Sequence, residues 1–163
     1  MAVLKPVSQQ DIETVQQLAN EIWHEHYSKI ISREQIDYML SIFHSTDRIL
    51  SETAEGCIWR LLWEDSLPVG YLMLKPEATR MYLSKIYLKK EFRGKGLGKL
   101  MMDFIKAQVV NNKMSIIYLN VNKSNTDTIR FYENNGFMKT GEGVFDIGKG
   151  FVMDDYIYEL RIV

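Results

Sequence analysis

The sequence predicts an α/β (α+β) fold, in which a mixed, mostly antiparallel sheet has one central parallel pair and carries helices on both faces. Three observations support it. Apolar residues recur at helical spacing over residues 8–55, β-branched and aromatic runs begin at Cys57, and a strand, a glycine loop, a helix and a strand follow one another over residues 81–121. A length of 163 residues fits one domain, so a single domain over residues 1–163 is expected.

Two helical regions are expected after a short N-terminal strand. Ser8 and Asp11 have the spacing of a capping box, and apolar residues follow at every third or fourth position. Ser32 and Gln35 give a second start signal before another apolar face. Gly56 is expected to end this helical part of the chain.

The middle of the chain predicts strands. Residues 57–63 and 69–75 are rich in β-branched and aromatic side chains and predict an antiparallel hairpin with a five-residue loop. Further strands are expected over residues 81–88 and 115–121, with an amphipathic helix between them that begins near Leu97. Such a βαβ unit should have a right-handed crossover and two parallel strands.

The last part of the chain predicts one more helix and a closing pair of strands. The helix covers residues 124–134, and Gly136 provides its left-handed cap. The strands cover residues 137–140 and 156–162. The glycine-bearing segment 141–150 between them is expected to be mobile.

Charge and cysteine content exclude several classes of function. Twenty Lys and Arg against 21 Asp and Glu give a formal net charge of −1, which offers no global attraction for nucleic acid or an anionic membrane. The single cysteine, Cys57, cannot form a disulfide within the chain and is expected to be a small buried hydrophobe. No window approaches the ~18 apolar residues of a membrane span. We therefore expect a cytoplasmic protein with neither a nucleic-acid nor a membrane partner.

A basic, glycine-rich segment lies directly between a predicted strand and a predicted helix. The start of a helix leaves backbone N–H groups unpaired and carries a partial positive charge, while glycines let a phosphate approach the backbone. Cationic side chains within the segment add full charges. We therefore expect a pyrophosphate site made of Arg93, Gly94, Lys95, Gly96, Leu97, Gly98 and Lys99.

Two known phosphate-binding loops do not fit this segment. A Walker loop ending at Gly98 and Lys99 would need glycine in place of Arg93 and a Ser or Thr in place of Leu100. The dinucleotide fingerprint would need Gly or Ala in place of Lys99, and it belongs to the first strand of a Rossmann sheet. Both alternatives are therefore set aside.

The pattern that does fit is Gln/Arg-x-x-Gly-x-Gly/Ala, which resembles the coenzyme A pyrophosphate loop of the GNAT N-acyltransferase superfamily. It is formed here by Arg93, Gly96 and Gly98. The resemblance extends over residues 81–140. Three more signatures in the family's order accompany it: Lys85-Ile86-Tyr87-Leu88, Leu119-x-Val121-x-x-x-Asn125, and Arg130-Phe131-Tyr132-Glu133-Asn134-Asn135-Gly136-Phe137.

The resemblance implies a GNAT-like fold and an N-acetyltransferase, in which an amine attacks the thioester of the co-substrate acetyl-CoA directly in a ternary complex. The glycine loop would hold the pyrophosphate, and the segment Ile86, Tyr87 and Leu88 would pair with the pantetheine arm through its backbone. Asn125 would bind the coenzyme arm, and Tyr132 would face the sulfur as the catalytic residue. The alternatives are a helix cap at Asn125 and a plain core residue at Tyr132.

Proton transfer sets limits on the residues that can take part. A phenol with pKa ~10 is a weaker acid than a thiol with pKa ~8.5, so Tyr132 is expected to donate a hydrogen bond to the developing thiolate. An alkylamine of pKa ~10.4 is protonated at pH 7 and needs a base or a water chain. Residues 81–85 contain no carboxylate. The base is therefore left unassigned among His24, Glu25, His26, Glu34, Asp146 and Asp154.

The acceptor is suggested by a looser similarity. Residues 22–39 are similar to GNAT members related to bacterial spermine/spermidine (polyamine) N-acetyltransferases. A polyamine pocket should carry carboxylates, and those available are Glu21, Glu25, Glu34 and Asp37. A small amine or polyamine is thus the first expectation. A protein or peptide amino group comes second, and an aminoglycoside or amino acid third.

Three further expectations concern a non-catalytic alternative, metal binding and the oligomeric state. A GNAT-like fold that binds acyl-CoA as a non-catalytic sensor is the alternative to an enzyme, because residues 81–85 lack the carboxylate that related enzymes often place on their fourth strand. No metal site is expected, because His24 and His26 would diverge by ~200° on a helix and His44 stands alone. A homodimer is consistent with the habit of the family.

Overall fold

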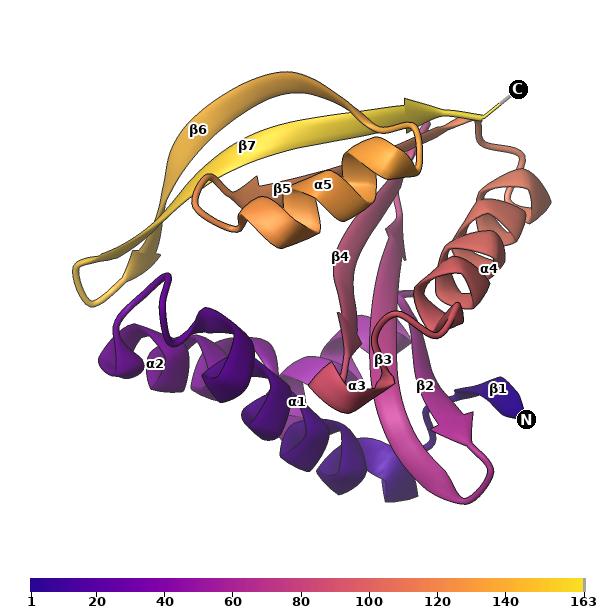
Figure 1. Cartoon of the computed structure of the whole chain (residues 1–163), viewed down its shortest axis with the longest axis horizontal. Helices are drawn as coiled ribbons and strands as arrows, with labels where there is room; N and C mark the ends of the chain where they lie inside the picture. The colour runs from indigo at the N-terminus through magenta and orange to yellow at the C-terminus, as the bar shows by residue number, and fades with distance from the viewer. Residues whose placement is uncertain (163) are drawn as a thin grey trace. The chain divides into compact units, whose positions relative to one another are not determined.

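A computed structural model describes residues 1–162, which group into two compact units (Figure 1). The first unit comprises Met1–Lys75 with Lys85–Ile105, and the second comprises Pro76–Ser84 with the described residues from Lys106 onward. The expectation of a single domain stays a prediction.

Most helices belong to the first unit. Its elements, in chain order, are β1 (Ala2–Pro6), the 3-10 helix η1 (Gln9–Asp11), α1 (Ile12–Tyr27), α2 (Arg33–Phe43), α3 (Thr46–Ala54), β2 (Ile58–Glu64), β3 (Leu67–Pro76) and the 3-10 helix η2 (Lys90–Phe92). Three elements have residues in both units: β3, β4 (Met81–Leu88) and α4 (Leu97–Asn111). The second unit adds β5 (Ile116–Asn122), α5 (Thr126–Asn134), β6 (Met138–Gly148) and β7 (Phe151–Arg161).

The predicted fold class is confirmed by the sheet. Its seven strands follow the order β1-β2-β3-β4-β5-β7-β6. The pairs β1–β2, β2–β3, β5–β7 and β6–β7 are antiparallel, and β4–β5 is parallel, as the βαβ pattern predicts. The sheet is therefore mixed and mostly antiparallel.

Local capping signals position the helices of the first unit. Ser8 and Asp11 form the capping box at η1, and the Ser32 hydroxyl accepts a hydrogen bond from the Gln35 N–H at 3.1 Å. A third cap differs from expectation. The hydroxyl of Ser45 accepts from the Arg48 N–H at 3.1 Å and starts α3 as a separate helix, whereas the sequence predicts one helical region from Ser32 to Gly56.

The hairpin of β2 and β3 is tighter than predicted, so the expected five-residue loop is wrong. Glu64 pairs with Leu67, which leaves a two-residue turn at Asp65 and Ser66. Asp65 adopts φ 55°, a left-handed conformation that Asp tolerates better than most residues. A register shift beside Trp63 accommodates the proline that follows in β3.

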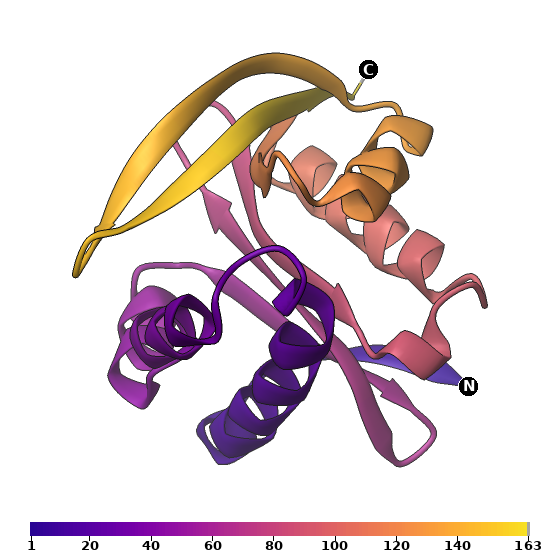
Figure 2. The ribbon, with the colours of Figure 1, turned by 60° about the vertical axis from the view of Figure 1, so that its left-hand side comes forward.

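Helices cover both faces of the strands in the first unit (Figure 2). On one face, Trp23 of α1 donates an indole hydrogen bond to the Tyr71 hydroxyl at 2.9 Å, and the ring of Trp59 stacks on Tyr71 at 6.5 Å. The next residue of β2, Arg60, lies over Phe104 of α4 at 5.4 Å. Since successive strand residues point to opposite faces, α1 and α4 pack on opposite faces.

A long hairpin dominates the second unit, as Figure 1 shows. β6 pairs with β7 from Met138↔Glu159 to Gly148↔Phe151, so the expectation of a mobile segment over residues 141–150 is wrong for most of its length. Pairing with β7 provides hydrogen-bond partners for the backbone N–H and C=O groups of β6, although β6 contains several glycines. Only Lys149 (φ 52°) and Gly150 (φ 80°) form the turn. None of the helices within residues 1–162 is both long enough and apolar enough to span a membrane.

Candidate functional site

The end of β4 that leads into the glycine loop is held against β3. The Lys89 N–H donates to the Val69 carbonyl at 2.8 Å. A Cβ placed on Gly70 would lie 2.6 Å from the Tyr87 carbonyl oxygen, so no larger residue fits there without a shift of the backbone. The backbone of Tyr87 and Leu88 is therefore fixed directly before the loop.

Side chains of this strand end point in two directions. Tyr87 lies among aromatic residues of the helical face: its hydroxyl is 3.0 Å from that of Tyr27, and its ring is 5.4 Å from that of Trp23. Ile86 and Leu88 alternate with Tyr87 and so face away from this cluster. The prediction that Ile86, Tyr87 and Leu88 bind a cofactor concerned their backbone groups, and it stays a prediction.

The loop itself presents an open backbone. Gly94 and Gly96 have φ values of 74° and 81°, in the left-handed region that favours glycine. Both are exposed, and a Cβ on either would meet no described atom within 4 Å. The side of the loop where side chains would project is therefore empty, which leaves room for a ligand to approach the backbone.

Unpaired amides lie at the start of α4. The first amide of this helix with a hydrogen-bond acceptor is that of Leu100, which donates to the Gly96 carbonyl at 3.2 Å. The N–H groups of Leu97, Gly98 and Lys99 have no acceptor among residues 1–162. Helix dipole and free donors together favour an anion at this position. The arrangement agrees with the predicted pyrophosphate site, although residue roles stay predictions.

The first cation of the loop is already engaged. Arg93 Nε donates to the Leu88 carbonyl at 3.0 Å, and its Nη2 lies 2.8 Å from Glu25 Oε1 of α1. These contacts fix the guanidinium beside the loop. Its charge is balanced in part by Glu25, which weakens its direct attraction for an anion.

The two lysines of the loop remain at the surface. Lys95 Nζ lies 5.4 Å from the centre of the Phe92 ring, and Lys99 Nζ pairs with Asp103 Oδ2 at 2.8 Å. The pair between Lys99 and Asp103 is exposed and i,i+4, so it contributes little and leaves the lysine easily redirected. Both lysines can thus supply positive charge near the free amides.

Asn125 and Tyr132 lie in the second unit, whereas the glycine loop lies in the first. Asn125 is 3% exposed, and although it occupies the N-cap position of α5, its side chain makes no cap hydrogen bond. The alternative of a plain helix cap therefore does not describe this side chain. Tyr132 is buried in α5, with its ring 5.5 Å from Phe137 and 5.7 Å from Phe131.

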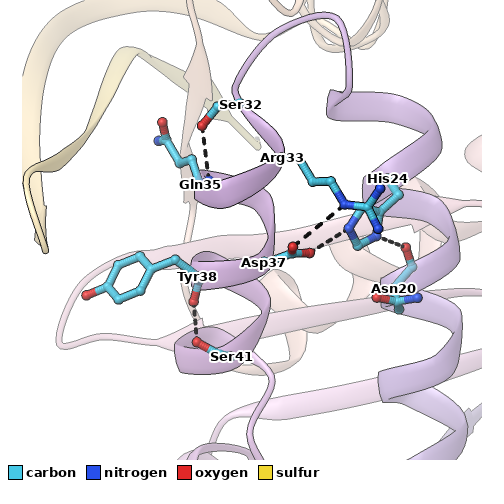
Figure 3. Close-up of polar contacts among 8 residues, drawn as sticks. All are labelled: Asn20, His24, Ser32, Arg33, Gln35, Asp37, Tyr38 and Ser41. Carbon is cyan, nitrogen blue, oxygen red and sulfur yellow. Dashed lines mark hydrogen bonds and ion pairs between the residues drawn. The ribbon is translucent and has the colours of Figure 1, made fainter.

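Among the residues considered as the base, His24 has both ring nitrogens occupied. Nδ1 lies 2.8 Å from the Asn20 carbonyl oxygen, and Nε2 lies 2.7 Å from Asp37 Oδ1 (Figure 3). A carbonyl and a carboxylate can only accept, so both hydrogen bonds form together only when both nitrogens carry protons. In this arrangement His24 has no lone pair with which to take a proton.

The other residues considered as the base have varied surroundings. Asp154 pairs with Lys123 at 3.0 Å, and Asp146 accepts the Gly148 N–H at 2.8 Å. Glu34 is exposed near the start of α2. The remaining candidates are Glu25, which binds Arg93, and His26, whose ring packs edge-on against Tyr27 at 4.9 Å.

The carboxylates expected to line a polyamine pocket are mostly balanced by cations of their own unit. Glu21 lies 3.2 Å from Lys89 Nζ. Glu25 pairs with the guanidinium described above, and Asp37 lies between His24 and Arg33, with 3.9 Å to Arg33 Nε (Figure 3). Three of the four predicted carboxylates are therefore partly neutralised, and Glu34 is the exception.

The sequence does not indicate that two polar residues, His44 and Asp155, are buried. His44 Nε2 lies 2.9 Å from the Tyr71 hydroxyl, and burial together with the charge of Lys85 lowers the pKa of His44 well below its usual value. Asp155, next to the considered Asp154, is 2% exposed. Its burial raises its pKa to about 6. Phe151, Val152 and Met153 before it are all apolar, so no alternating pattern in the sequence indicates it.

Cys57 is buried, and burial raises the pKa of its thiol, in agreement with the expected small hydrophobe. No group of three or more His, Cys, Asp or Glu among residues 1–162 is arranged to hold a metal ion.

Comparison with known proteins shows which family and which proteins the chain is similar to. Residues 12–137 match the acetyltransferase (GNAT) family. A spermidine N(1)-acetyltransferase of Thermoplasma acidophilum is 28% identical over 141 residues, which cover 82% of this chain and 86% of that protein. A peptidyl-lysine N-acetyltransferase, YjaB, of Salmonella typhimurium is 28% identical over 105 residues, which cover 64% of this chain and 66% of that protein.

A solved structure confirms the fold. The crystal structure of the PaiA N-acetyltransferase from Thermoplasma acidophilum in complex with coenzyme A matches with a TM-score of 0.83 and 25% sequence identity, over 99% of each chain. The predicted arrangement of a mixed sheet around one parallel pair is thus found in a protein crystallised with coenzyme A.

Proposed function

The chain belongs to the GNAT family of acetyltransferases, and from this premise we propose that it moves an acetyl group from acetyl-CoA to a primary amine of a small molecule or polyamine. The observation that carries the proposal is the start of α4. There, Leu97, Gly98 and Lys99 offer amides with no acceptor among the described residues, beside two exposed left-handed glycines.

The start of α4 suits the diphosphate of the co-substrate. Amides at the start of a helix are pre-oriented donors, and two exposed lysines, Lys95 and Lys99, add charge. The relative that was crystallised with coenzyme A supports acetyl-CoA as the acyl donor. In the proposal, the backbone of Ile86, Tyr87 and Leu88 pairs with the pantetheine arm.

The chemistry proposed is one direct transfer. The lone pair of the neutral amine attacks the thioester carbonyl carbon, and the C–S bond breaks. The nitrogen releases one proton as the amide forms, and coenzyme A leaves as a thiolate that takes up a proton. Tyr132 donates a hydrogen bond to the sulfur as charge develops on it, and Asn125 holds the coenzyme arm. The ammonium form of the amine must first lose a proton, at a cost of about 4–5 kcal/mol at pH 7.

The acceptor class rests on the relatives. The spermidine acetyltransferase supports a polyamine, and the peptidyl-lysine acetyltransferase supports a lysine side chain of a protein as the second candidate. Both acceptors carry a primary alkylamine, so the same attack serves either. A cytoplasmic location and a homodimer stay predictions.

The deciding experiment measures release of free thiol from acetyl-CoA. The acceptors are spermidine, spermine, a simple monoamine and a lysine-containing peptide, with a control without an amine. We expect acceptor-dependent release that is fastest with a polyamine. Faster release with the peptide would favour the second acceptor. Tight binding of acetyl-CoA without acceptor-dependent release from any amine would overturn the enzyme and favour the acyl-CoA sensor.

A further inference from the structure

An unpaired carboxylate is buried in the sheet of the second unit. Asp155 of β7 is 2% exposed, and its Oδ2 has no hydrogen-bond partner among the described residues. Burial raises the pKa of this carboxyl, and the side chain of Asn120 on β5 is near enough to lower it in part. One of its two oxygens is thus left with no donor, although buried polar atoms are nearly always paired.

No cation of the described chain neutralises this group by an ion pair. Lys123, whose charge acts on Asp155, is held between Glu142 at 2.8 Å and Asp154 at 3.0 Å. Asp154 precedes Asp155 in the strand, so its side chain points to the opposite face, where it is exposed. Burying an unpaired carboxylate is costly, and folding alone does not explain why one is kept.

Strand register shows which side chains lie on the same face of the sheet as Asp155. Asp155 pairs with Asn122, and Asn120 lies two positions along β5 on the same side. Two positions further, Tyr118 pairs with Tyr82 of β4, and the two rings are 4.8 Å apart. Burial raises the pKa of Tyr82 to about 12, and the charges of Tyr118 and Asp155 add to this effect.

These groups have the chemistry that an alkylammonium group requires. A carboxylate with a free oxygen supplies an anionic acceptor, Asn120 supplies a second polar group, and aromatic rings attract a cation and pack against its methylene chain. We propose that Asp155, with Asn120 and the ring of Tyr82, binds an ammonium group of the amine acceptor. The inference deepens the proposed function and rests on it.

The test compares Asp155→Asn with wild type, and Glu142→Gln provides the matched control, because it removes an exposed carboxylate from the neighbouring strand β6 of the same unit. Initial rates of thiol release give kcat and the KM for spermidine and for acetyl-CoA, and thermal unfolding gives the Tm. For Asp155→Asn we expect the spermidine KM to rise by roughly 10-fold or more, with the acetyl-CoA KM unchanged and the Tm not lowered. Glu142→Gln should leave the spermidine KM at the wild-type value.

Two results would overturn the inference. One is an unchanged spermidine KM in Asp155→Asn. The other is a parallel loss of acetyl-CoA affinity and Tm, which would show a structural role. If wild type acetylates no amine, the proposed function has failed, and calorimetric titration of both proteins with spermidine then decides on the site itself. Weaker binding to the Asp155→Asn variant supports the site, and equal binding removes it.

Discussion

Arg93 and Glu25 join the glycine loop to helix α1, with Nη2 and Oε1 2.8 Å apart. A second ion pair, between Lys89 and Glu21 at 3.2 Å, lies one turn earlier on the same helix. Residues 21 and 25 are i,i+4 neighbours, so both pairs use one face of α1. The segment that connects β4 to α4 is thereby attached to the helix twice.

We expect the coupling between Arg93 and Glu25 to be small. Both side chains are about one third exposed (36% and 34%), and ion pairs in such positions contribute roughly 0.2–1 kcal/mol. A double-mutant cycle with Arg93→Gln and Glu25→Gln, read by urea unfolding, measures this coupling. It should shrink in 1 M salt. The more exposed Lys99–Asp103 pair, put through the same cycle, should give less. Coupling above about 2 kcal/mol would contradict this estimate.

Gly96→Val should weaken the binding of acetyl-CoA by about 10-fold or more, because its side chain would project where the phosphates approach. The left-handed φ of 81° also means a loss of stability of roughly 1–2 kcal/mol. Gly56 has φ 96°, is exposed and has similar open space, so Gly56→Val controls for this loss of stability. Calorimetric titration with acetyl-CoA should show weaker binding to Gly96→Val than to Gly56→Val. Equal affinities would show that the loop does not hold the diphosphate.

In the proposed mechanism, Tyr132→Phe removes the hydroxyl that donates to the leaving sulfur and keeps the ring, so it should lower kcat by about 100-fold while acetyl-CoA affinity changes little. The control is Tyr158→Phe, which removes a hydroxyl that donates to Glu133 Oε2 at 3.1 Å in the same unit. It should keep a kcat close to that of wild type. Steady-state rates with a saturating amine measure both. Wild-type kcat in Tyr132→Phe would remove this residue from the mechanism.

Features encoded by neighbouring residues could be predicted from the sequence. The bounds of β4 agree with the predicted strand over residues 81–88, and the Ser32 cap is found as expected. The glycine loop belongs to the same class, since its φ values and the free amides after it depend only on a few consecutive residues. Local backbone preferences decide such features.

Features that depend on distant pairing could not be predicted. Gly141 and Gly143 suggest a loop when they are considered alone, but pairing with Ile157 and Asp155 makes them part of a strand. The same register decides that Asp155 is buried and Asp154 exposed, two adjacent identical residues that the sequence alone does not distinguish. Partners of charged groups, such as Glu25 for Arg93, are likewise distant in sequence.

Lys85 makes the free energy of unfolding change with pH in the alkaline range. Its side chain is buried, with Nζ 5.1 Å from the centre of the Trp59 ring, and burial lowers its pKa from 10.5 to about 8. Below pH 8 the ammonium is present in both the folded and the unfolded chain, and the cost of burying it is complete. Between pH 8 and 10.5 the unfolded chain binds a proton that the folded chain has released, so the free energy of unfolding rises with pH.

Lys85→Met lacks this titration. The free energy of unfolding of wild type minus that of the variant should therefore increase by up to about 3 kcal/mol between pH 7 and pH 10.5. Urea unfolding of both proteins at intervals across this range measures the difference, in which the titration of groups not coupled to Lys85 cancels. For Lys90→Met, at an exposed position of η2, the difference in free energy of unfolding from wild type should not change with pH. A difference for Lys85→Met that does not change with pH would show that the folded chain keeps this lysine charged.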